Sequence, residues 1–399
     1  MLDLTYVRGQ FPAFSEPSLQ GWAFFENAGG SYACQPVIDR LTRFYQQRKV
    51  QPYAPYPASE AGGAEMDEAR TRLSALMNIA PDELSFGPST TQNTYVLAQA
   101  VRQAMQPGEA IIVTNQDHEA NSGPWRRLAD HGIEVREWKI DPETGHLDPA
   151  ALENLLDESV RLVCFPHCSN VVGEINSVAE ITALAHAAGA WVCVDGVSYA
   201  PHGLPDLDVL GCDIYLFSAY KTYGPHQGIM AIRRALAELL PNQGHSFNGD
   251  TLYKKFTPAG PDHAQVAACA GMVDYIEALA AHQGVPPREV AGLMHAHEVA
   301  LMQPLLDYLD AKNSVRLLGP AQAENRAPTI AVALQRPAEE VARALAQHGI
   351  MAGGGDFYAV RPLSAMGVDL DKGVLRLSFV HYTAPDEVEK LLKALDAVL

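Results

Sequence analysis

The chain has 399 residues, of which 47% are hydrophobic and 19% are charged, and its 29 Lys+Arg against 47 Asp+Glu give a formal net charge of -18. This length is sufficient for a large buried core in one large domain or two ordinary ones. A surface this acidic repels a phosphate backbone, so we expect no nucleic-acid partner. No apolar run reaches the roughly 18 residues that span a bilayer, and the first residues lack a secretory core, so we expect no membrane segment.

In chain order we expect a strand at 110–114, a helix at 123–131, strands at 133–138 and 161–165, a helix at 178–188, and strands at 190–194, 214–217 and 229–232. Apolar strands that alternate with amphipathic helices predict a mostly parallel sheet covered on both faces. Right-handed crossovers bring the strand ends and the helix starts to one edge of such a sheet, where ligands bind.

The pattern changes after the Gly-Val-Pro-Pro segment at 284–287. A long helix at 289–310 is followed by strands at 329–334 and 374–379 and by helices at 339–348 and 385–398. This pattern predicts a smaller α+β domain. We therefore divide the chain into a large α/β domain at 21–284 and a small domain made of 1–20 and 285–399, which closes over the active site.

The six cysteines share neither the spacing of a disulfide framework nor that of a metal site. Cys193 and Cys212 lie in apolar runs, which is typical of small core residues. We therefore expect a reducing compartment, a cytoplasmic location and no metal.

Lys221 is the most informative residue, because it directly follows an apolar strand and is flanked by Ser, Tyr and a Gly-Pro turn. Asp195 ends the preceding predicted strand. Neighbouring strands can deliver this amine and this carboxylate to one pocket. Pyridoxal phosphate needs such a pair, with a lysine to form an imine and an aspartate to keep the pyridine nitrogen protonated.

The segments Val-Asp-Gly at 194–196 and Ser-Ala-Tyr-Lys-Thr-Tyr-Gly-Pro-His at 218–226 resemble the class V aminotransferase family of fold type I pyridoxal phosphate enzymes, in particular its cysteine desulfurase-like branch. The resemblance extends from about Phe24 to the C-terminus. It implies a large domain with a mostly parallel seven-stranded sheet sandwiched by helices, and a smaller α+β C-terminal domain. It also implies pyridoxal 5'-phosphate as the cofactor and a homodimer with shared sites.

The same resemblance assigns the cofactor-binding residues. Thr90 and Thr91 open a predicted helix whose hydroxyls and free amides suit a phosphate. His118 is expected to stack on the cofactor ring and to move protons at the substrate Cα, and Asn170 to bond the phenolic oxygen. The remaining positions are Ser218 and Tyr220, as further phosphate contacts, and Ser198, where the desulfurases often have Gln.

Arg376 is expected to bind the α-carboxylate of an amino-acid substrate. It lies within an otherwise apolar strand, and a buried guanidinium needs an anionic partner. The alternative is a pair with an internal Asp or Glu. Ala28 and Gly29 match the segment that lines the substrate mouth, where small residues allow close backbone approach.

Two departures from the family pattern limit the function. Cysteine desulfurases carry a nucleophilic Cys in a loop that corresponds to 349–362, which has no cysteine, and Tyr358 lies where that nucleophile is expected. We expect Tyr358 or Arg361 to contact the distal substrate group, next to a tri-glycine lid at 353–355. Pro261 replaces the threonine that supplies a phosphate contact from the partner subunit, so that contact is not expected.

We therefore expect an enzyme that acts on an amino acid through a Lys221 imine and Cα deprotonation, of the aminotransferase or β-elimination (C–S lyase) type, and not a loop-cysteine desulfurase. The alternatives are an amino-acid epimerase or racemase of the isopenicillin N epimerase type and a desulfurase that uses another thiol. A pyridoxal phosphate-binding regulatory protein without turnover is the alternative outside enzymes. A nucleotide-dependent enzyme is disfavoured because no G-x-G-x-x-G or P-loop follows the first strands.

Overall fold

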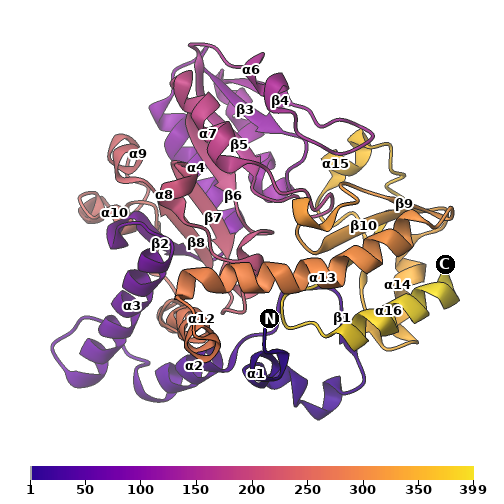
Figure 1. Cartoon of the computed structure of the whole chain (residues 1–399). Helices are drawn as coiled ribbons and strands as arrows, with labels where there is room; N and C mark the ends of the chain where they lie inside the picture. Colours follow the sequence, from indigo (N-terminus) through magenta and orange to yellow (C-terminus); the bar gives the residue numbers. More distant parts are fainter. Residues whose placement is uncertain (1) are drawn as a thin grey trace.

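Seven strands form the larger sheet of the structure, a computed structural model that describes residues 2–399 (Figure 1). Their spatial order is β2 (Leu84–Gly87), β8 (Gly228–Ile232), β7 (Ile214–Ser218), β6 (Trp191–Asp195), β5 (Val160–Pro166), β3 (Ala110–Thr114) and β4 (Glu134–Trp138). Only β8 runs against the others, since it pairs antiparallel with both β2 and β7. The prediction of a mostly parallel seven-stranded sheet is confirmed.

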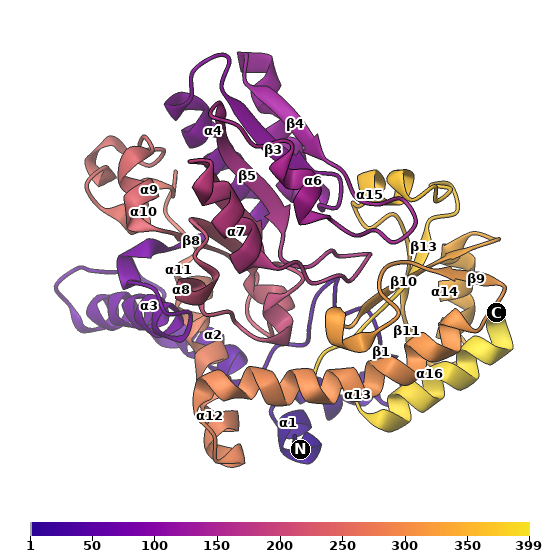
Figure 2. The ribbon, with the colours of Figure 1, turned by 45° about the horizontal axis from the view of Figure 1, so that its top comes forward.

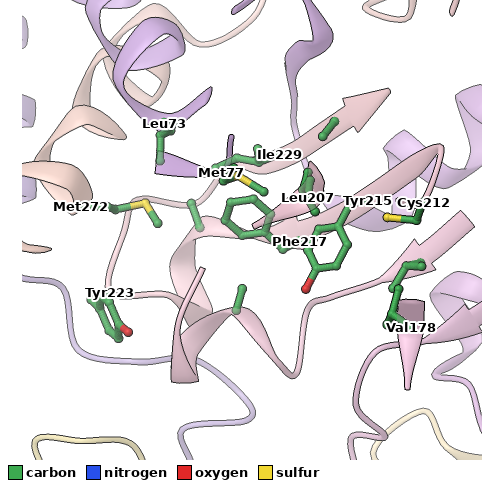
Figure 3. Packing of buried hydrophobic residues seen from close by; sticks show 14 of the residues in the cluster. Leu73, Met77, Val178, Leu207, Cys212, Tyr215, Phe217, Tyr223, Ile229 and Met272 are labelled. Atoms are coloured by element: carbon green, nitrogen blue, oxygen red, sulfur yellow. The ribbon is translucent and has the colours of Figure 1, made fainter. Parts of the chain in front are cut away.

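Both faces of this sheet are buried, as the continuous apolar runs predict. Successive strand residues alternate between two hydrophobic clusters. Ile112, Val163 and Phe217 belong to the first cluster, and Ile111 and Leu162 belong to the second. The first cluster is covered by α3 (Pro57–Leu76), α7 (Val178–Ala187) and α12 (Ala270–Gln283), and the second by α4 (Thr90–Ala104) and α5 (Gly123–Arg126). Figure 3 shows part of the first cluster, where Phe217 and Tyr215 of β7 lie near Met77 and Leu207.

The predicted elements of this part of the chain are present with small shifts at their ends. One of them is different in kind, because the helix predicted at 123–131 is α5 followed by a 3-10 helix at Arg127–His131. Other helices of this part are α1 (Leu4–Gly9), α2 (Gln35–Gln47), α6 (Pro149–Glu153), α8 (Leu207–Leu210), α9 (Arg234–Leu239), α10 (Leu252–Lys255) and α11 (His263–Ala268).

The C-terminal part has its own sheet of four antiparallel strands, in the order β12 (Gly353–Gly355), β13 (Val374–Ser378), β10 (Thr329–Leu334) and β9 (Val315–Leu317). The helices α14 (Ala338–Ala346), α15 (Val360–Ala365) and α16 (Pro385–Val398) accompany it, which confirms the predicted α+β pattern. A two-stranded parallel pair joins β1 (Ala23–Phe24) to β11 (Ile350–Met351). Figure 2 shows these elements together at one end of the molecule.

One long helix, α13 (Val290–Asp310), runs from the large sheet to the small one (Figures 1 and 2). Its first half packs in the cluster of the large sheet through Met294, and its second half packs in the small cluster through Leu305. Phe11 packs against the large-sheet cluster, whereas Phe25 belongs to the small cluster. The division into 21–284 and 1–20 with 285–399 remains a proposal.

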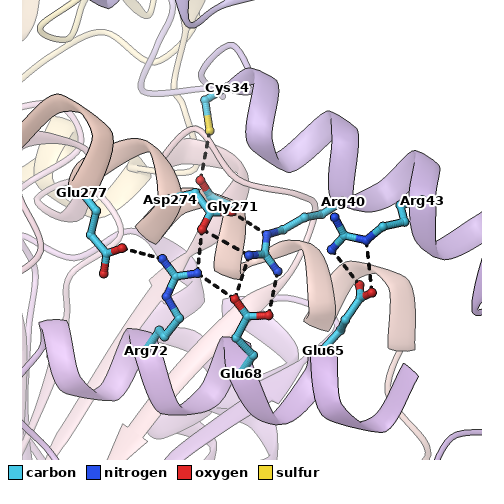
Figure 4. Close-up of polar contacts among 9 residues, drawn as sticks. All are labelled: Cys34, Arg40, Arg43, Glu65, Glu68, Arg72, Gly271, Asp274 and Glu277. Carbon is cyan, nitrogen blue, oxygen red and sulfur yellow. Dashed lines mark hydrogen bonds and ion pairs between the residues drawn. The ribbon is translucent and has the colours of Figure 1, made fainter. Parts of the chain in front are cut away.

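A network of ion pairs joins α2, α3 and α12 at the surface (Figure 4). The Arg40 guanidinium contacts Glu68 and Asp274, and Arg72 contacts the same two carboxylates. Because several charges share partners, this network fixes the three helices more firmly than isolated surface pairs would. Across residues 2–399 the structure has no helix long and apolar enough to cross a membrane.

Candidate active site

A cavity of about 590 Å³ opens at the carboxyl ends of β5, β6 and β7, between the two sheets. Strand ends of parallel sheets are where ligands bind. The predicted site residues that line it are Ala28, Gly29, Thr90, Thr91, His118, Asn170, Asp195, Ser198, Ser218, Tyr220, Lys221, Tyr358 and Arg376. Among the predicted site residues, Arg361 alone does not line the cavity.

Lys221 ends a short 3-10 helix, Ala219–Lys221, that follows β7 directly. The residue is 9% exposed, and its Nζ makes no hydrogen bond within residues 2–399. Burial, followed by the charge of Arg376, lowers the pKa of this amine to about 8, although Asp195 and Glu26 oppose the shift. An unprotonated amine is therefore accessible near neutral pH, which a nucleophile or a general base requires.

Asp195 is the last residue of β6 and is 5% exposed. Its Oδ1 accepts a hydrogen bond from the Val197 backbone N–H at 2.8 Å. Burial raises the pKa of this carboxyl to about 6, against the opposing effects of that hydrogen bond and of Lys221. A buried carboxylate of this kind gains most from a cationic N–H partner such as a protonated pyridine nitrogen.

His118 follows β3 and begins the short 3-10 helix Glu119–Asn121. Its Nδ1 accepts a hydrogen bond from the Ala120 backbone N–H at 3.0 Å, which assigns the ring proton to Nε2. Burial, with the charges of Lys221 and Arg376, lowers the pKa of this imidazole to about 3. The ring is therefore neutral at physiological pH and suited to stacking on an aromatic cofactor.

Hydroxyls and helix amides form one end of the cavity. Ser89 caps α4 by accepting from the Gln92 N–H, and Ser89, Thr90 and Thr91 at this helix start line the cavity. The Thr90 and Ser218 hydroxyls are 2.8 Å apart. A helix N-terminus beside paired hydroxyls suits a phosphate dianion.

Arg376 forms the opposite end of the cavity from β13 and is 4% exposed. Its Nη2 donates to Glu26 Oε1 at 2.5 Å, and the Phe357 ring lies 3.8 Å from its guanidinium carbon. Burial lowers the pKa of this guanidinium, while Glu26 acts in the opposite direction. The internal acid considered in the sequence as an alternative partner is therefore present, and it is Glu26.

The loop over Arg376 holds two consecutive aromatic residues in the left-handed region, Phe357 at φ 52° and Tyr358 at φ 56°. Non-glycine residues in this region store about 1–3 kcal/mol each, which surrounding contacts must offset. The Phe357 carbonyl accepts from Asn170 Nδ2 at 2.9 Å, and the Tyr358 carbonyl accepts from the Glu119 N–H. Tyr358 is 72% exposed, and its ring lies 5.4 Å from that of His118.

Arg361 lies in α15 and directs its Nε toward Glu119, 3.4 Å from the carboxylate. Glu119 itself lines the cavity, so Arg361 acts on the cavity through that carboxylate rather than by direct contact. The predicted site residues did not include eleven further lining residues, among them Glu26, Phe357, Glu119 and Tyr95. Glu119 adjoins His118 and could have been found by that proximity, whereas nothing local in the sequence indicates Phe357 or Tyr95.

Unpartnered polar atoms support the fit of pyridoxal phosphate to this cavity. Within residues 2–399, Asn170 Oδ1 and Arg376 Nε are buried without a hydrogen-bond partner. Buried polar atoms are normally paired, so these atoms indicate a ligand. Asp195 suits the pyridine nitrogen, Lys221 the aldehyde, His118 the ring face, and the start of α4 the phosphate, and no residue of the set conflicts with this assignment.

The chain matches the family Aminotransferase class-V over residues 23–391, and it belongs to that family. It is a fold type I, pyridoxal phosphate-dependent enzyme.

Individual relatives cover nearly the whole chain. It is 34% identical to the aminotransferase-like protein FGM3 of Gibberella zeae, with 98% of each chain covered. It is 32% identical to a cysteine desulfurase of Serratia proteamaculans, covering 98% of this chain and 97% of the relative. Among solved structures, the apo cysteine desulfurase of Thermococcus onnurineus has a TM-score of 0.87 at 23% identity, covering 99% of this chain and 98% of that one.

Proposed function

We propose that the chain acts on an amino acid by removing its Cα proton and then transferring the amino group or eliminating a β-substituent. The observation that carries this proposal is the position of Lys221 in one cavity with Asp195 and Arg376. Bound pyridoxal phosphate supplies an electron sink for the carbanion at Cα. Arg376 binds the α-carboxylate, and the free Lys221 amine, whose pKa burial lowers to about 8, takes the proton.

The absence of a cysteine from 349–362 argues against a loop-cysteine desulfurase, although several relatives carry the name cysteine desulfurase. The cavity does contain one thiol, that of Cys168. Burial raises the pKa of Cys168 to about 12, and its Sγ lies within hydrogen-bond distance of the Ser169 and Gly173 carbonyl oxygens. A thiol held in this form is a poor nucleophile, so we rank a desulfurase that uses another thiol below transamination and elimination.

Epimerisation ranks lower for a related reason. It requires a proton donor on the face of Cα opposite Lys221, and His118 occupies the ring face of the proposed site. Burial lowers the pKa of His118 to about 3, so a neutral imidazole with an occupied Nδ1 makes a weak donor at neutral pH.

A panel of amino acids incubated with the holoenzyme tests the proposal by measuring keto acid, ammonia, sulfide and inverted product. We expect keto acid or ammonia from at least one amino acid, lost in Lys221→Ala together with the visible absorbance. Cys168→Ser is the matched control, and it should retain the activity. Sulfide release that Cys168→Ser abolishes would instead establish a desulfurase, and inverted product alone would establish an epimerase.

We also propose a cytoplasmic homodimer. Large aromatic side chains are exposed near α2, α3 and the cavity mouth, including Tyr45, Tyr53, Tyr56 and Tyr95, and a second copy would cover them. All six cysteines lie within residues 2–399 and are unpaired, which agrees with a reducing compartment. Light scattering after size exclusion tests the dimer, and a monomer mass would refute it.

A further inference from the structure

A second, much smaller cavity lies directly behind Lys221. Its volume is about 10 Å³, close to what one water molecule requires. It shares Ala28, Val197, Ser198 and Lys221 with the main cavity, so these residues form the wall between the two. The small cavity, unlike the main one, is also lined by His202, which ends the 3-10 helix Ala200–His202.

His202 is paired with a buried carboxylate from α13. Its Nδ1 lies 3.1 Å from Glu298 Oε2, with side-chain exposures of 8% and 0%. The Nδ1 atom faces the carboxylate, which leaves the other ring nitrogen, Nε2, for another partner. The proposed cofactor chemistry at the main cavity uses neither residue. A fully buried acid that does not contact the substrate needs another explanation, since burying its charge is costly.

We propose that His202, oriented by Glu298, exchanges a proton with Lys221 through one water molecule bound in the small cavity. This inference rests on the proposed role of Lys221 as the cofactor lysine. His202 and Glu298 act through Lys221 and are therefore positioning residues. Ser198, which lines both cavities, supplies a hydroxyl that orients the water.

The proton count balances without a further reactant. A protonated Lys221 Nζ gives one proton to the water, the water gives one to His202 Nε2, and the imidazolium is stabilised by the Glu298 carboxylate at Nδ1. The reverse transfer returns the proton to Lys221. Lys221 must be unprotonated to attack an aldehyde or to take a Cα proton, so the pair gives its proton a destination outside the main cavity.

Three other titratable groups lie near His202 and Glu298. The charge of Glu298 acts on Tyr199, which follows β6, and on Tyr223, which follows Lys221, and the charge of His202 acts on His381, which follows β13. Burial lowers the pKa of His381 to about 3 and raises the pKa values of Tyr199 and Tyr223, so these three groups are neutral at physiological pH. His297, next to Glu298 on α13, bonds the Thr383 carbonyl instead.

The first measurement uses apo-protein and needs no turnover. Nitrogen-15 labelling of histidine reports the tautomer of His202, assigned by its loss in His202→Gln. We expect Lys221→Ala to change the nitrogen-15 shift of His202 Nε2, because the water that bridges the two groups loses one hydrogen-bond partner. His297→Gln is the matched control, and it should leave the His202 signal in place. Identical His202 nitrogen-15 signals in wild type and Lys221→Ala would overturn the relay.

The second measurement follows the pH midpoint of the visible absorbance of the holoenzyme without substrate. Glu298→Gln removes a buried negative charge and should lower it, His202→Gln leaves the Glu298 carboxylate unpaired and should raise it, and His297→Gln should not shift it. Unshifted midpoints in two folded variants would refute the proposal. A preparation that stays colourless with wild-type Lys221 would refute the proposed function instead, and the apo-protein measurement would still decide the relay.

Discussion

Glu26→Gln should make the protein less stable and its substrate affinity higher. In the structure the Glu26 carboxylate occupies Arg376, the group proposed to bind the substrate α-carboxylate. An amino acid must therefore displace Glu26 or share the guanidinium with it. Glutamine keeps the side-chain volume and one hydrogen-bond acceptor but removes the competing charge.

The magnitude follows from the burial of the two partners. Arg376 has a side-chain exposure of 4% and Glu26 one of 27%. Breaking a fully buried pair costs about 3–5 kcal/mol, whereas exposed pairs contribute about 0–1 kcal/mol. We place this half-buried pair at about 1–3 kcal/mol. Without a ligand, the variant should have a free energy of unfolding lower by this amount. A substrate carboxylate that pairs with Arg376 restores the same interaction energy, which corresponds to roughly 5- to 150-fold tighter binding.

Urea unfolding with and without an amino-acid ligand, together with a titration of the holoenzyme, measures both quantities. Glu119→Gln is the control, because this second cavity glutamate pairs with Arg361 and not with Arg376. It should not tighten binding of the α-carboxylate. Unchanged or weaker substrate binding in Glu26→Gln would refute competition between Glu26 and the substrate for Arg376.

Three further predictions concern pH and packing. Because burial lowers the pKa of Lys221 to about 8, the rate at which apo-protein forms its imine with pyridoxal phosphate should rise through pH 8 and then level, whereas an ordinary lysine would keep accelerating to about pH 10.4. Burial raises the pKa of Asp195 to about 6, and a protonated carboxyl must lose its proton to pair with the protonated pyridine nitrogen. The affinity for the cofactor should therefore fall as the pH drops through 6, and Asp195→Asn should abolish that pH dependence. In Gly228→Ala the new Cβ would lie 2.4 Å from the Ser89 carbonyl carbon, which should displace the start of α4, weaken cofactor binding and lower the free energy of unfolding by about 1–3 kcal/mol, whereas Gly292→Ala, with open space around it, should not destabilise the protein.

The large sheet could be predicted because its signal is local. Five-residue apolar runs separated by amphipathic segments define buried strands, and the structure has a strand at each predicted position, as at 110–114 and 229–232. Lys221 and Asp195 could be found for the same reason, since each ends or follows such a run. The single helix predicted at 123–131 is wrong in its second half, because Arg127–His131 form a 3-10 helix that ends at Gly132.

Residues that meet across long distances in the sequence were not accessible in this way. Glu26 and Arg376 are 350 positions apart in the sequence. The antiparallel register of β12 and β13 places Gly353 opposite Arg376, and because glycine has no side chain, the Glu26 carboxylate can reach the guanidinium. A Cβ at Gly353 would lie 2.6 Å from Glu26 Oε2. The tri-glycine segment at 353–355 was predicted as a loop that forms a lid, but it is strand β12 of the small sheet.

The chain is acidic overall, but its proposed active site is cationic. The net charge of -18 belongs mostly to carboxylates outside the buried core, which solvent screens, while Lys221 and Arg376 are both desolvated in the lining of one cavity. Burial lowers both pKa values, and the charge of Arg376 lowers that of Lys221 further, so each cation is more favourable once an anion arrives. A carboxylate at Arg376 therefore also removes part of the field that depresses the pKa of Lys221. Substrate binding should thus raise the proton affinity of the lysine at the moment when it must accept a proton from Cα.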